Sequence, residues 1–473
     1  MICLIKNQRS LRRRWVVKRV LIVAILVTSS VVAHAQTLSV SELSERVDLL
    51  AKQALARPVA GISIAVAHNG RIVFARGYGL ANIEHSVAVT PDTVFHIASV
   101  SKNILTGVIL RLAEENKLRL DAEVTEYVPE APTHGLHITV RQLLNHTSGI
   151  YSFTSLPDAE NNERFELTHE QVLNLFKDKA LDFEPGSSWR YDNSAFYLAG
   201  MVVERVTKQE YGQYVREQVF APLGMTSASL CDARMVVAHL ASGYEVDHGT
   251  LVNGPFFSWK LPFAAGAVCA TATDVLKWQM AVEAGSAVTA SSLEMMRTPT
   301  KLSDGTTLDY GLGTRIGTLD GHRVFGHTGG GGGFNAVMAS FPDDHLSIVV
   351  LMNSRSGAGP SLALSAAIAR AILGLPEKKT LRDLVAPKEE LTGLLGTYDS
   401  DEGAVENFAD PRDGKLHYRL PGSAIEGVLL RQAPYVYAID ENTEVHFLPQ
   451  NGRSRWAIVY SGGLMMDAKL RVK

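Results

Sequence analysis

The chain has 473 residues, of which 46% are hydrophobic and 20% charged. This composition is typical of a folded globular protein larger than one average domain. Its formal net charge is −3, which does not indicate the basic surface of a nucleic-acid-binding protein. The three cysteines are too few for a disulfide framework and lack the paired spacing of a zinc site.

The first 35 residues have the layout of an export signal. Seven Lys and Arg residues lie between Lys6 and Arg19 with no acidic residue, and the apolar run VLIVAILV and the small residues Ala33 and Ala35 follow. The run is shorter than the roughly 20 residues that span a bilayer. We therefore expect residues 1–35 to be a cleaved signal peptide and the protein to be periplasmic or secreted, with no stable membrane anchor. Cleavage would leave 46 minus 7, or 39, basic residues against 49 acidic ones.

The mature chain is expected to begin with a helix that leads into a hairpin. SELSERVDLLAKQALA, residues 41–56, has helical apolar spacing with Ser41 as its cap. ISIAVAHNGRIVFARGYG, residues 62–79, consists of two alternating runs joined by Asn69-Gly70, a pair that tolerates the positive φ angles of a tight hairpin turn.

The middle of the chain, about 108–278, has mostly helical periodicity, and strands return over about 311–353. LALSAAIARAILG is expected to be a closing helix, with Gly374 just past its end. The pattern predicts an α/β (α+β) domain over residues 36–378, in which helices flank an antiparallel sheet and a helical region is inserted. After a charged linker, short alternating segments over 388–473 predict a small antiparallel barrel or sandwich.

In FHIASVSKNIL, residues 95–105, a lysine interrupts an otherwise apolar helix. Ser99 and Lys102 are three residues apart, so on a helix they share a face. A serine hydroxyl is a weak nucleophile until a neighbour accepts its proton, and an amine one turn away is placed to do so. Ser101 would point to another face.

Two further segments carry polar groups suited to a catalytic site. WRYDNSAFYLAG places Tyr191 and Asn193 just before a helix, where Asp192 or Asn193 could equally act as a cap. VFGHTGGGGGF places His327 and five glycines at the end of a short strand, where missing side chains would let a substrate approach the backbone.

These three elements, in this order, resemble the signature of the serine β-lactamase and penicillin-binding-protein superfamily, S-x-x-K, then Y-x-N, then K-T-G. The Y-x-N form is that of its class C-like branch of esterases, D-aminopeptidases, D,D-carboxypeptidases and β-lactamases. TVRQLLNHTSGI, PLGM and AAGAVCATATDVLKW also look like that branch. The resemblance implies a β-lactamase/transpeptidase-like fold, and the tail resembles the lipocalin-like β-domains of some relatives.

Carried onto this sequence, the resemblance implies that Ser99 attacks a carbonyl and becomes acylated while Lys102 and Tyr191 share its proton. Which of the two is the general base stays open. Asn193 would hold the substrate's amide. The backbone N–H groups of Ser99 and Gly330 would form the oxyanion hole.

His327 and Gly329 would complete the substrate-binding strand, but His327 stands where K-T-G has lysine. A neutral imidazole binds a carboxylate less well than an ammonium does. We therefore favour an exported hydrolase of esters or peptides, including peptides that contain D-residues, over a β-lactamase or D,D-carboxypeptidase. A non-catalytic wall-fragment-binding or lipid-binding protein of the same fold is the remaining alternative.

Other candidates carry less chemistry. His146 and Ser148 are too close in sequence for a mutual catalytic hydrogen bond, and we expect a structural role for them. No metalloprotease, P-loop or dinucleotide motif is present, so no metal or cofactor is expected. FFSW, residues 256–259, is interpreted as core rather than pocket wall. Cys231 and Cys269 are either isolated buried thiols, which we favour, or one disulfide. Nothing in the sequence indicates an oligomeric state.

Overall fold

The computed structural model describes residues 39–162, 164–231, 234–355, 359–400, 404–409, 413–420 and 426–472. The expected signal peptide, residues 1–35, lies outside them. No helix within these ranges is long and apolar enough to cross a bilayer.

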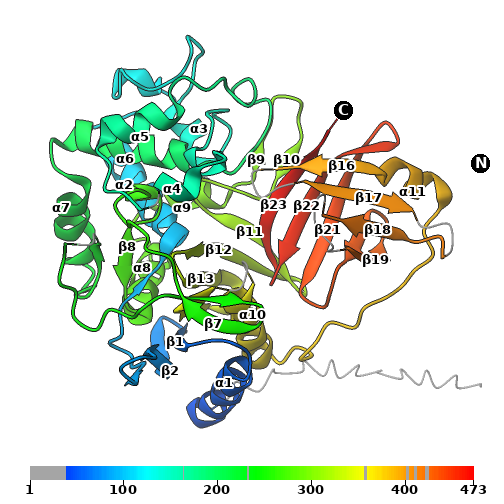
Figure 1. Ribbon diagram of the computed structural model, residues 1–473, viewed down its shortest axis with the longest axis horizontal. Helices are drawn as coiled ribbons and strands as arrows, with labels where there is room; N and C mark the ends of the chain where they lie inside the picture. Colours follow the sequence, from blue (N-terminus) through cyan, green and yellow to red (C-terminus); the bar gives the residue numbers. More distant parts are fainter. Residues whose placement is uncertain are drawn as a thin grey trace, which may run out of the picture. The chain divides into compact units, whose positions relative to one another are not determined.

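The centre of the α/β domain is an antiparallel sheet built from both ends of that domain, as the sequence predicts (Figure 1). Its strands are β1 (Gly61–His68), β2 (Arg71–Asn82), β3 (Val87–Ala88), β11 (Arg315–Leu319), β12 (His322–Gly331), β13 (Phe334–Phe341) and β14 (Leu346–Met352). They lie in the order β11-β12-β13-β14-β1-β2-β3. Asn69 and Gly70 join β1 to β2 with φ angles of 53° and 70°, so the predicted hairpin turn is confirmed.

Helices cover both faces of this sheet. On one face α1 (Val40–Leu55) and α10 (Pro360–Leu373) bury apolar side chains such as Val47 and Ile368 against strand residues such as Ile64. The cap of α1 is Ser39 and not the predicted Ser41, because the Ser39 hydroxyl accepts from Glu42 N–H and Glu42 reaches back in a capping box. α10 is followed by Gly374 in the left-handed conformation, as predicted.

The other face carries the inserted helical region, which holds the largest apolar cluster of the described residues. Its helices are α2 (Ser101–Glu114), α3 (Val140–Leu144), α4 (Ala159–Asn162), α5 (His169–Phe176), α6 (Asn193–Thr207), α7 (Tyr211–Val215), α8 (Ala272–Glu283) and α9 (Ala290–Arg297). Short strands lie among them: β4 (Phe95–His96), β5 (Ser229–Leu230), β6 (Tyr244–Asp247), β7 (Thr250–Asn253), β8 (Val268–Ala270), β9 (Thr300–Lys301), β10 (Thr307–Leu308) and β15 (Ser354–Arg355).

The C-terminal region is a closed antiparallel barrel. Its strands are β16 (Gly396–Asp399), β17 (Val405–Ala409), β18 (Leu416–Arg419), β19 (Glu426–Ala433), β20 (Val436–Ala438), β21 (Thr443–Gln450), β22 (Arg453–Ser461) and β23 (Leu464–Arg471). Each pairs with the next, and β16 also pairs with β23, which closes the ring. Tyr398, Leu416 and Phe447 fill the interior, together with Leu394 of the unpredicted helix α11 (Lys388–Leu394).

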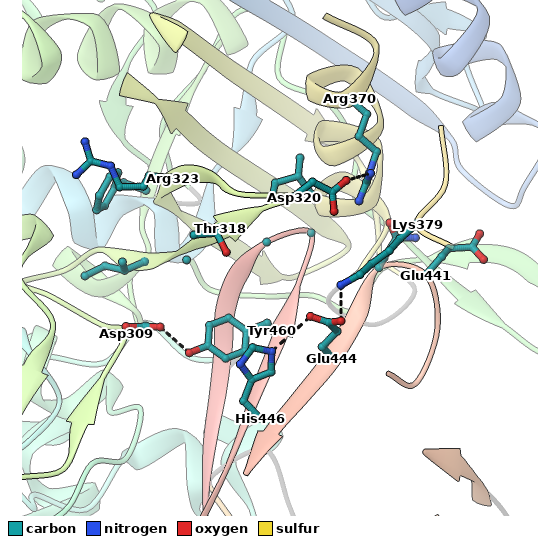
Figure 2. A pocket seen from close by; sticks show the side chains of 17 residues that line it. Asp309, Thr318, Asp320, Arg323, Arg370, Lys379, Glu441, Glu444, His446 and Tyr460 are labelled. Carbon is teal, nitrogen blue, oxygen red and sulfur yellow. Dashed lines mark hydrogen bonds and ion pairs between the residues drawn. The ribbon is translucent and has the colours of Figure 1, made fainter. Parts of the chain in front are cut away.

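The barrel joins the central sheet along β11. Gly317 of β11 pairs with Leu464 of β23, and a side chain at Gly317 would collide with the carbonyl oxygen of Gly463. Polar contacts flank this junction (Figure 2). The Tyr460 hydroxyl donates to Asp309 at 2.6 Å. We call this contact between barrel and sheet, made by the Gly317–Leu464 pairing and the Tyr460–Asp309 hydrogen bond, the seam.

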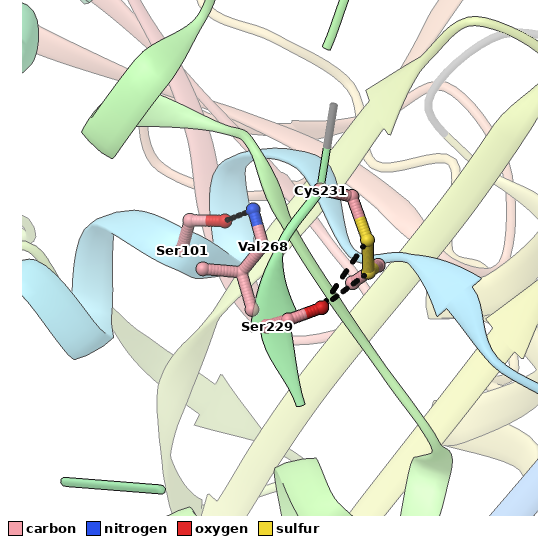
Figure 3. The surroundings of a disulfide bond; sticks show 5 residues. Ser101, Ser229, Cys231 and Val268 are labelled. Atoms are coloured by element: carbon pink, nitrogen blue, oxygen red, sulfur yellow. Dashed lines mark hydrogen bonds between the residues drawn. A yellow bond between two sulfur atoms is a disulfide. The ribbon is translucent and has the colours of Figure 1, made fainter. Parts of the chain in front are cut away.

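Cys231 and Cys269 form a disulfide (Figure 3). The favoured prediction of two isolated buried thiols is therefore wrong. Cys269 lies on β8, whose neighbour β5 leads directly into Cys231, and the pairing brings the two Cα atoms to 5.8 Å, a normal separation for a disulfide. β8 also pairs with β4, the strand that leads to Ser99. The disulfide therefore stabilises β8, the strand that supports the segment leading to Ser99.

Removing this bond should destabilise the protein. The cysteines are 38 residues apart, so the Cys231→Ala/Cys269→Ala variant should lose roughly 4 kcal/mol of unfolding free energy through the entropy of the longer unfolded chain. Urea denaturation measures this loss. Wild-type protein unfolded with a reductant should behave like the variant, and an unchanged urea midpoint in the variant would contradict the assignment.

Candidate active site

Ser99 lies in a tight turn that begins the central helix of the insertion. The turn is a short 3-10 segment, Ala98–Val100, that runs directly into α2. β8 holds it on both sides, because Ile97 N–H donates to Val268 O at 3.0 Å and Val268 N–H donates to the Ser101 hydroxyl at 3.2 Å. Ala98 has a φ of 45°, a conformation that costs a non-glycine residue energy and that often accompanies a functional site.

Lys102 is fully buried directly beside Ser99. Its Nζ lies 3.0 Å from Ser99 Oγ, 2.7 Å from Asn193 Oδ1 and 2.9 Å from the carbonyl oxygen of Ala265. A protonated amine can donate to all three oxygens. A neutral amine can donate to Asn193 and Ala265 and present its lone pair to the Ser99 hydroxyl. The surroundings of Lys102 therefore suit both sides of a proton transfer with Ser99.

Asn193, the first residue of α6, connects the second predicted segment to this pair. Its Oδ1 accepts from Lys102, and its Nδ2 donates to the Thr154 hydroxyl at 2.9 Å. Its backbone N–H donates to the Ser152 hydroxyl at 3.1 Å. These contacts fix the orientation of the amide, which also lines the cleft beside Ser99.

Tyr191 packs against charged and aromatic groups of the same site. Lys102 Nζ lies 4.9 Å from the centre of the Tyr191 ring, and the ring of His146 lies 4.4 Å away. On another side the guanidinium carbon of Arg315 lies 5.3 Å from the ring centre. The structure thus brings Ser99, Lys102, Tyr191 and Asn193 together, although nearly one hundred residues separate the two pairs.

A buried hydrogen-bonded chain lies behind Tyr191. Asp192 N–H donates to His146 Nδ1 at 3.0 Å, so Nε2 carries the proton of a neutral His146 and lies 3.1 Å from the Tyr310 hydroxyl. That hydroxyl lies 3.1 Å from His327 Nε2, while His327 Nδ1 lies 2.6 Å from the carbonyl oxygen of Thr328. A carbonyl only accepts, so His327 carries its proton on Nδ1 and Tyr310 donates to Nε2.

Both histidines of this hydrogen-bonded chain, His146 and His327, stay neutral. Burial lowers the pKa of His146 and of His327 well below the usual histidine value, and the positive charges of Lys102 and Arg315 lower both further. Tyr310 is fully buried, and this burial raises its pKa well above the usual value. The chain therefore keeps one protonation pattern around neutral pH. The structural role expected for His146 fits this arrangement.

His327 is neutral, as the sequence analysis expects, but its ring does not face the cleft. The side chain is fully buried and both ring nitrogens are engaged by Tyr310 and Thr328. A direct contact between His327 and a substrate therefore has no support from this geometry.

The glycines after His327 lie against the Ser99 turn. A side chain at Gly329 would collide with the carbonyl oxygen of Ile97 and come within 3.1 Å of Ser99 N. Gly330, the next residue, lines the cleft together with Ser99. Only a strand without side chains fits this closely, so the glycine run has a steric reason at Gly329.

The cleft beside Ser99 has a volume of about 490 Å³, which is within the range of small-molecule sites. Phe256, Phe257 and Trp259 line one side, so FFSW forms pocket wall as well as core and the preference for core alone is corrected. Arg355 adds an exposed guanidinium. A Cβ atom at Gly330 would lie 3.9 Å from Arg355 Nε.

Sequence reasoning missed several contributors to this site. The carbonyl of Ala265 and the hydroxyl of Tyr310 carry no local signal, because their roles depend on contacts between distant segments. Arg315 could have been noticed, since it is an arginine within the segment predicted to form strands, whereas Arg355 lies just after that segment. Among the described residues no cluster of His, Cys, Asp and Glu could hold a metal ion.

Comparisons with known proteins identify the family to which this chain is similar. The Beta-lactamase family model matches residues 47–372. Penicillin-binding protein 4* of Bacillus subtilis is 23% identical over 86% of this chain and 94% of its own length. A D-aminopeptidase of Gluconobacter oxydans is 26% identical over 80% of this chain and 70% of its own length.

Among solved structures, the octameric penicillin-binding protein homologue from Pyrococcus abyssi has a TM-score of 0.63 and 25% identity, over 92% of this chain and 100% of that one. A match over 92% of the chain has to extend past residue 372, where the family model ends, into the C-terminal barrel. This chain belongs to the beta-lactamase family of serine hydrolases, with a C-terminal antiparallel β-barrel added to the family fold.

Proposed function

We propose that this protein is an exported hydrolase that cleaves an ester or a peptide bond, including bonds next to a D-amino acid, through an acyl-enzyme on Ser99. The observation that carries the proposal is the convergence of the Ser99 hydroxyl, the buried Lys102 amine and the Tyr191 ring at one cleft. A hydroxyl, a proton acceptor and an orienting group in contact are the parts that nucleophilic catalysis requires.

In this reaction Ser99 Oγ attacks the carbonyl carbon of the substrate, and its proton passes to Lys102 or Tyr191. The lone pair that a neutral Lys102 presents to Ser99 supports a first transfer to the amine, since Asn193 and Ala265 already occupy its two hydrogens. The Tyr191 ring, next to Lys102, is placed to take part in delivering the proton to the leaving group. Water then releases the acyl group.

The negative oxygen formed by this attack would accept hydrogen bonds from the backbone N–H groups of Ser99 and Gly330. Both residues line the cleft, and the close approach of Gly329 to Ser99 N holds the two backbone segments together. Each donor of this kind contributes about 2.7–4 kcal/mol to transition-state stabilisation.

Arg355 affects the choice between substrates. The preference for esters and neutral peptides rests on the neutrality of His327, but Arg355 supplies a cation at the cleft beside Gly330. Guanidinium groups bind carboxylates well. This observation favours, as a second candidate, a β-lactamase or D,D-carboxypeptidase activity on carboxylate-bearing substrates.

Export is supported by the disulfide, because such bonds persist mainly in oxidising compartments. The lipocalin-like assignment of the barrel is supported by its eight consecutive antiparallel strands β16 to β23 and its closure. Its interior is filled by side chains such as Tyr398 and Phe447. A filled interior does not support the alternative in which the barrel is a separate ligand module of a non-catalytic protein.

Replacing Ser99 with alanine should lower turnover at least about a thousandfold, as removal of a catalytic nucleophile does. The melting temperature should change little, because only a half-buried hydroxyl is lost. Intact-mass measurement after exposure to a fluorophosphonate should show one adduct on the wild type and none on Ser99→Ala. Wild-type turnover by the variant would refute the assignment.

Gly329→Ala should lower kcat/KM by about 100-fold, because a shift of roughly 1 Å at a catalytic group can cost that much. The new methyl group would press on Ile97 O and displace β12 from the Ser99 turn. Gly330→Ala should lose less, since the atoms nearest to the added methyl group would lie 3.9 Å away. Equal kcat/KM values for Gly329→Ala and the wild type would show that this approach is not needed.

A substrate panel should separate the two candidate activities. We expect a short-chain nitrophenyl ester and a D-alanyl peptide to be hydrolysed faster than a chromogenic cephalosporin. Steady-state rates at neutral pH measure this order. A cephalosporin rate far above the others, reduced in Arg355→Met, would favour the second candidate.

A further inference from the structure

Arg315 is a buried cation that contacts both the barrel and the catalytic site. Its side chain belongs to the first residue of β11 and is 4% exposed. Its Nη1 donates to the carbonyl oxygen of Met465 at 2.8 Å and to that of Met466, both on β23 of the barrel. Its guanidinium carbon lies 5.3 Å from the centre of the Tyr191 ring.

We propose that Arg315 is a positioning residue that supplies the second positive charge next to Tyr191, and that strand β23 of the barrel holds it there. This inference rests on the proposed function, because it assigns Arg315 an effect that acts through Tyr191. It also gives the barrel a part in catalysis that does not require the barrel to bind a ligand.

The charge of Arg315 is not neutralised locally. A guanidinium remains protonated in proteins, and Arg315 forms no ion pair with any carboxylate among the described residues. Its buried Nε also lacks a hydrogen-bond acceptor there. Buried polar groups are normally satisfied, so an exception calls for an explanation. Placement of an uncompensated charge beside Tyr191 is such an explanation.

The field of Arg315 reaches the catalytic site. Its positive charge is one cause of the lowered pKa of His327 and of His146, the two rings that flank Tyr191. A cation that disfavours protonation of a neighbouring imidazole also favours the negative form of a neighbouring phenol. Lys102 and Arg315 lie 4.9 Å and 5.3 Å from the Tyr191 ring centre, so two cations act on one phenol.

This arrangement changes the charge balance expected from the sequence. The exchange of lysine for His327 predicts a site with less positive charge, and His327 is indeed neutral. Arg315 supplies a positive charge in its place. This charge comes from strand β11 and lies against the Tyr191 ring instead of in the cleft. Among the described residues, the ionisable groups that face Tyr191 are Lys102 on α2, His146 after α3, Tyr310 before β11, Arg315 on β11 and His327 on β12. Its chain neighbours are Asp192 and Arg190, and Arg190 is paired with Asp182 and Asp399.

Asp192 is the neighbour whose titration could be confused with that of the site. Burial raises its pKa to about 7. The main influences on this carboxyl are burial, the backbone N–H groups of Ala195 and Ser194, Asp182 and Ser148, and Arg315 is not one of them. Removal of the Arg315 charge should therefore change the titration of Asp192 less than that of the groups beside Tyr191.

The seam sets the position of Arg315. Its two acceptors belong to β23, the strand that pairs with β11 at Gly317 and Leu464. Tyr460 of the neighbouring strand β22 fixes the same junction through Asp309 (Figure 2). A purely structural role, in which Arg315 only anchors the barrel, predicts the same loss of stability but no change in the pH dependence of the reaction.

The test compares full-length Arg315→Met and Arg315→Lys with the wild type, using p-nitrophenyl butyrate between pH 5 and pH 9. Arg315→Met should lower kcat/KM at pH 7 about tenfold and move the acidic limb of the pH profile up by about one pH unit. Arg315→Lys keeps a charge and should recover most of both changes. Tyr460→Phe removes the hydrogen bond to Asp309 but keeps the Arg315 charge and its two carbonyl acceptors, so it should leave the limb in place.

An Arg315→Met profile that coincides with the wild-type profile, with only a lower melting temperature, would overturn the inference. If Arg315→Met does not fold, Arg315→Lys becomes the deciding variant. Loss of activity in Arg315→Lys without any shift of the acidic limb would also contradict the inference. Ser99→Ala separates this result from the proposed function. If Ser99→Ala still hydrolyses the ester, the proposed function fails; if it is inactive while Arg315→Met matches the wild type, only the role of Arg315 fails.

Discussion

The burial of the Lys102 amine is the constraint on which the rest of the site depends. An amine removed from water is costly unless its hydrogens and lone pair find partners. Three separate segments meet that requirement: the Ser99 turn, the start of α6 at Asn193 and the carbonyl of Ala265. The inserted helical region therefore packs around Lys102 so that all three partners reach the amine. The same packing places the Ser99 hydroxyl, the Asn193 amide and the Tyr191 phenol next to one another.

Further supports keep this arrangement in place from outside. β8 holds the Ser99 turn through Val268, and the Cys231–Cys269 bond anchors β8. Behind Tyr191, the chain from His146 through Tyr310 to His327 has one direction of hydrogen bonding and stays neutral. The result is a rigid surround for a small number of ionisable groups, which is what preorganised electrostatic catalysis requires.

The parts of this structure that the sequence predicted are those with local or recurrent signals. The Asn69-Gly70 turn follows from φ preferences of two residues, and the pairing of Ser99 with Lys102 follows from helical spacing. The contribution of Arg315 could not be predicted, because its neighbours Tyr191 and Met465 come from segments that only the tertiary fold brings together. The partners of His327 are hidden for the same reason, and only its neutrality was accessible from its chemistry. Ser39 was missed as a cap because Ser41 offers an equally good local signal.

The position of the last strand has a consequence for when the site can be completed. The acceptors of Arg315 lie 150 and 151 residues after it in the chain. During synthesis the central sheet, with its glycine strand, emerges well before β23 does. Until the ribosome has released β23 and the barrel has closed, the guanidinium lacks these two carbonyl acceptors. Assembly of the finished site is thus tied to the synthesis of the barrel.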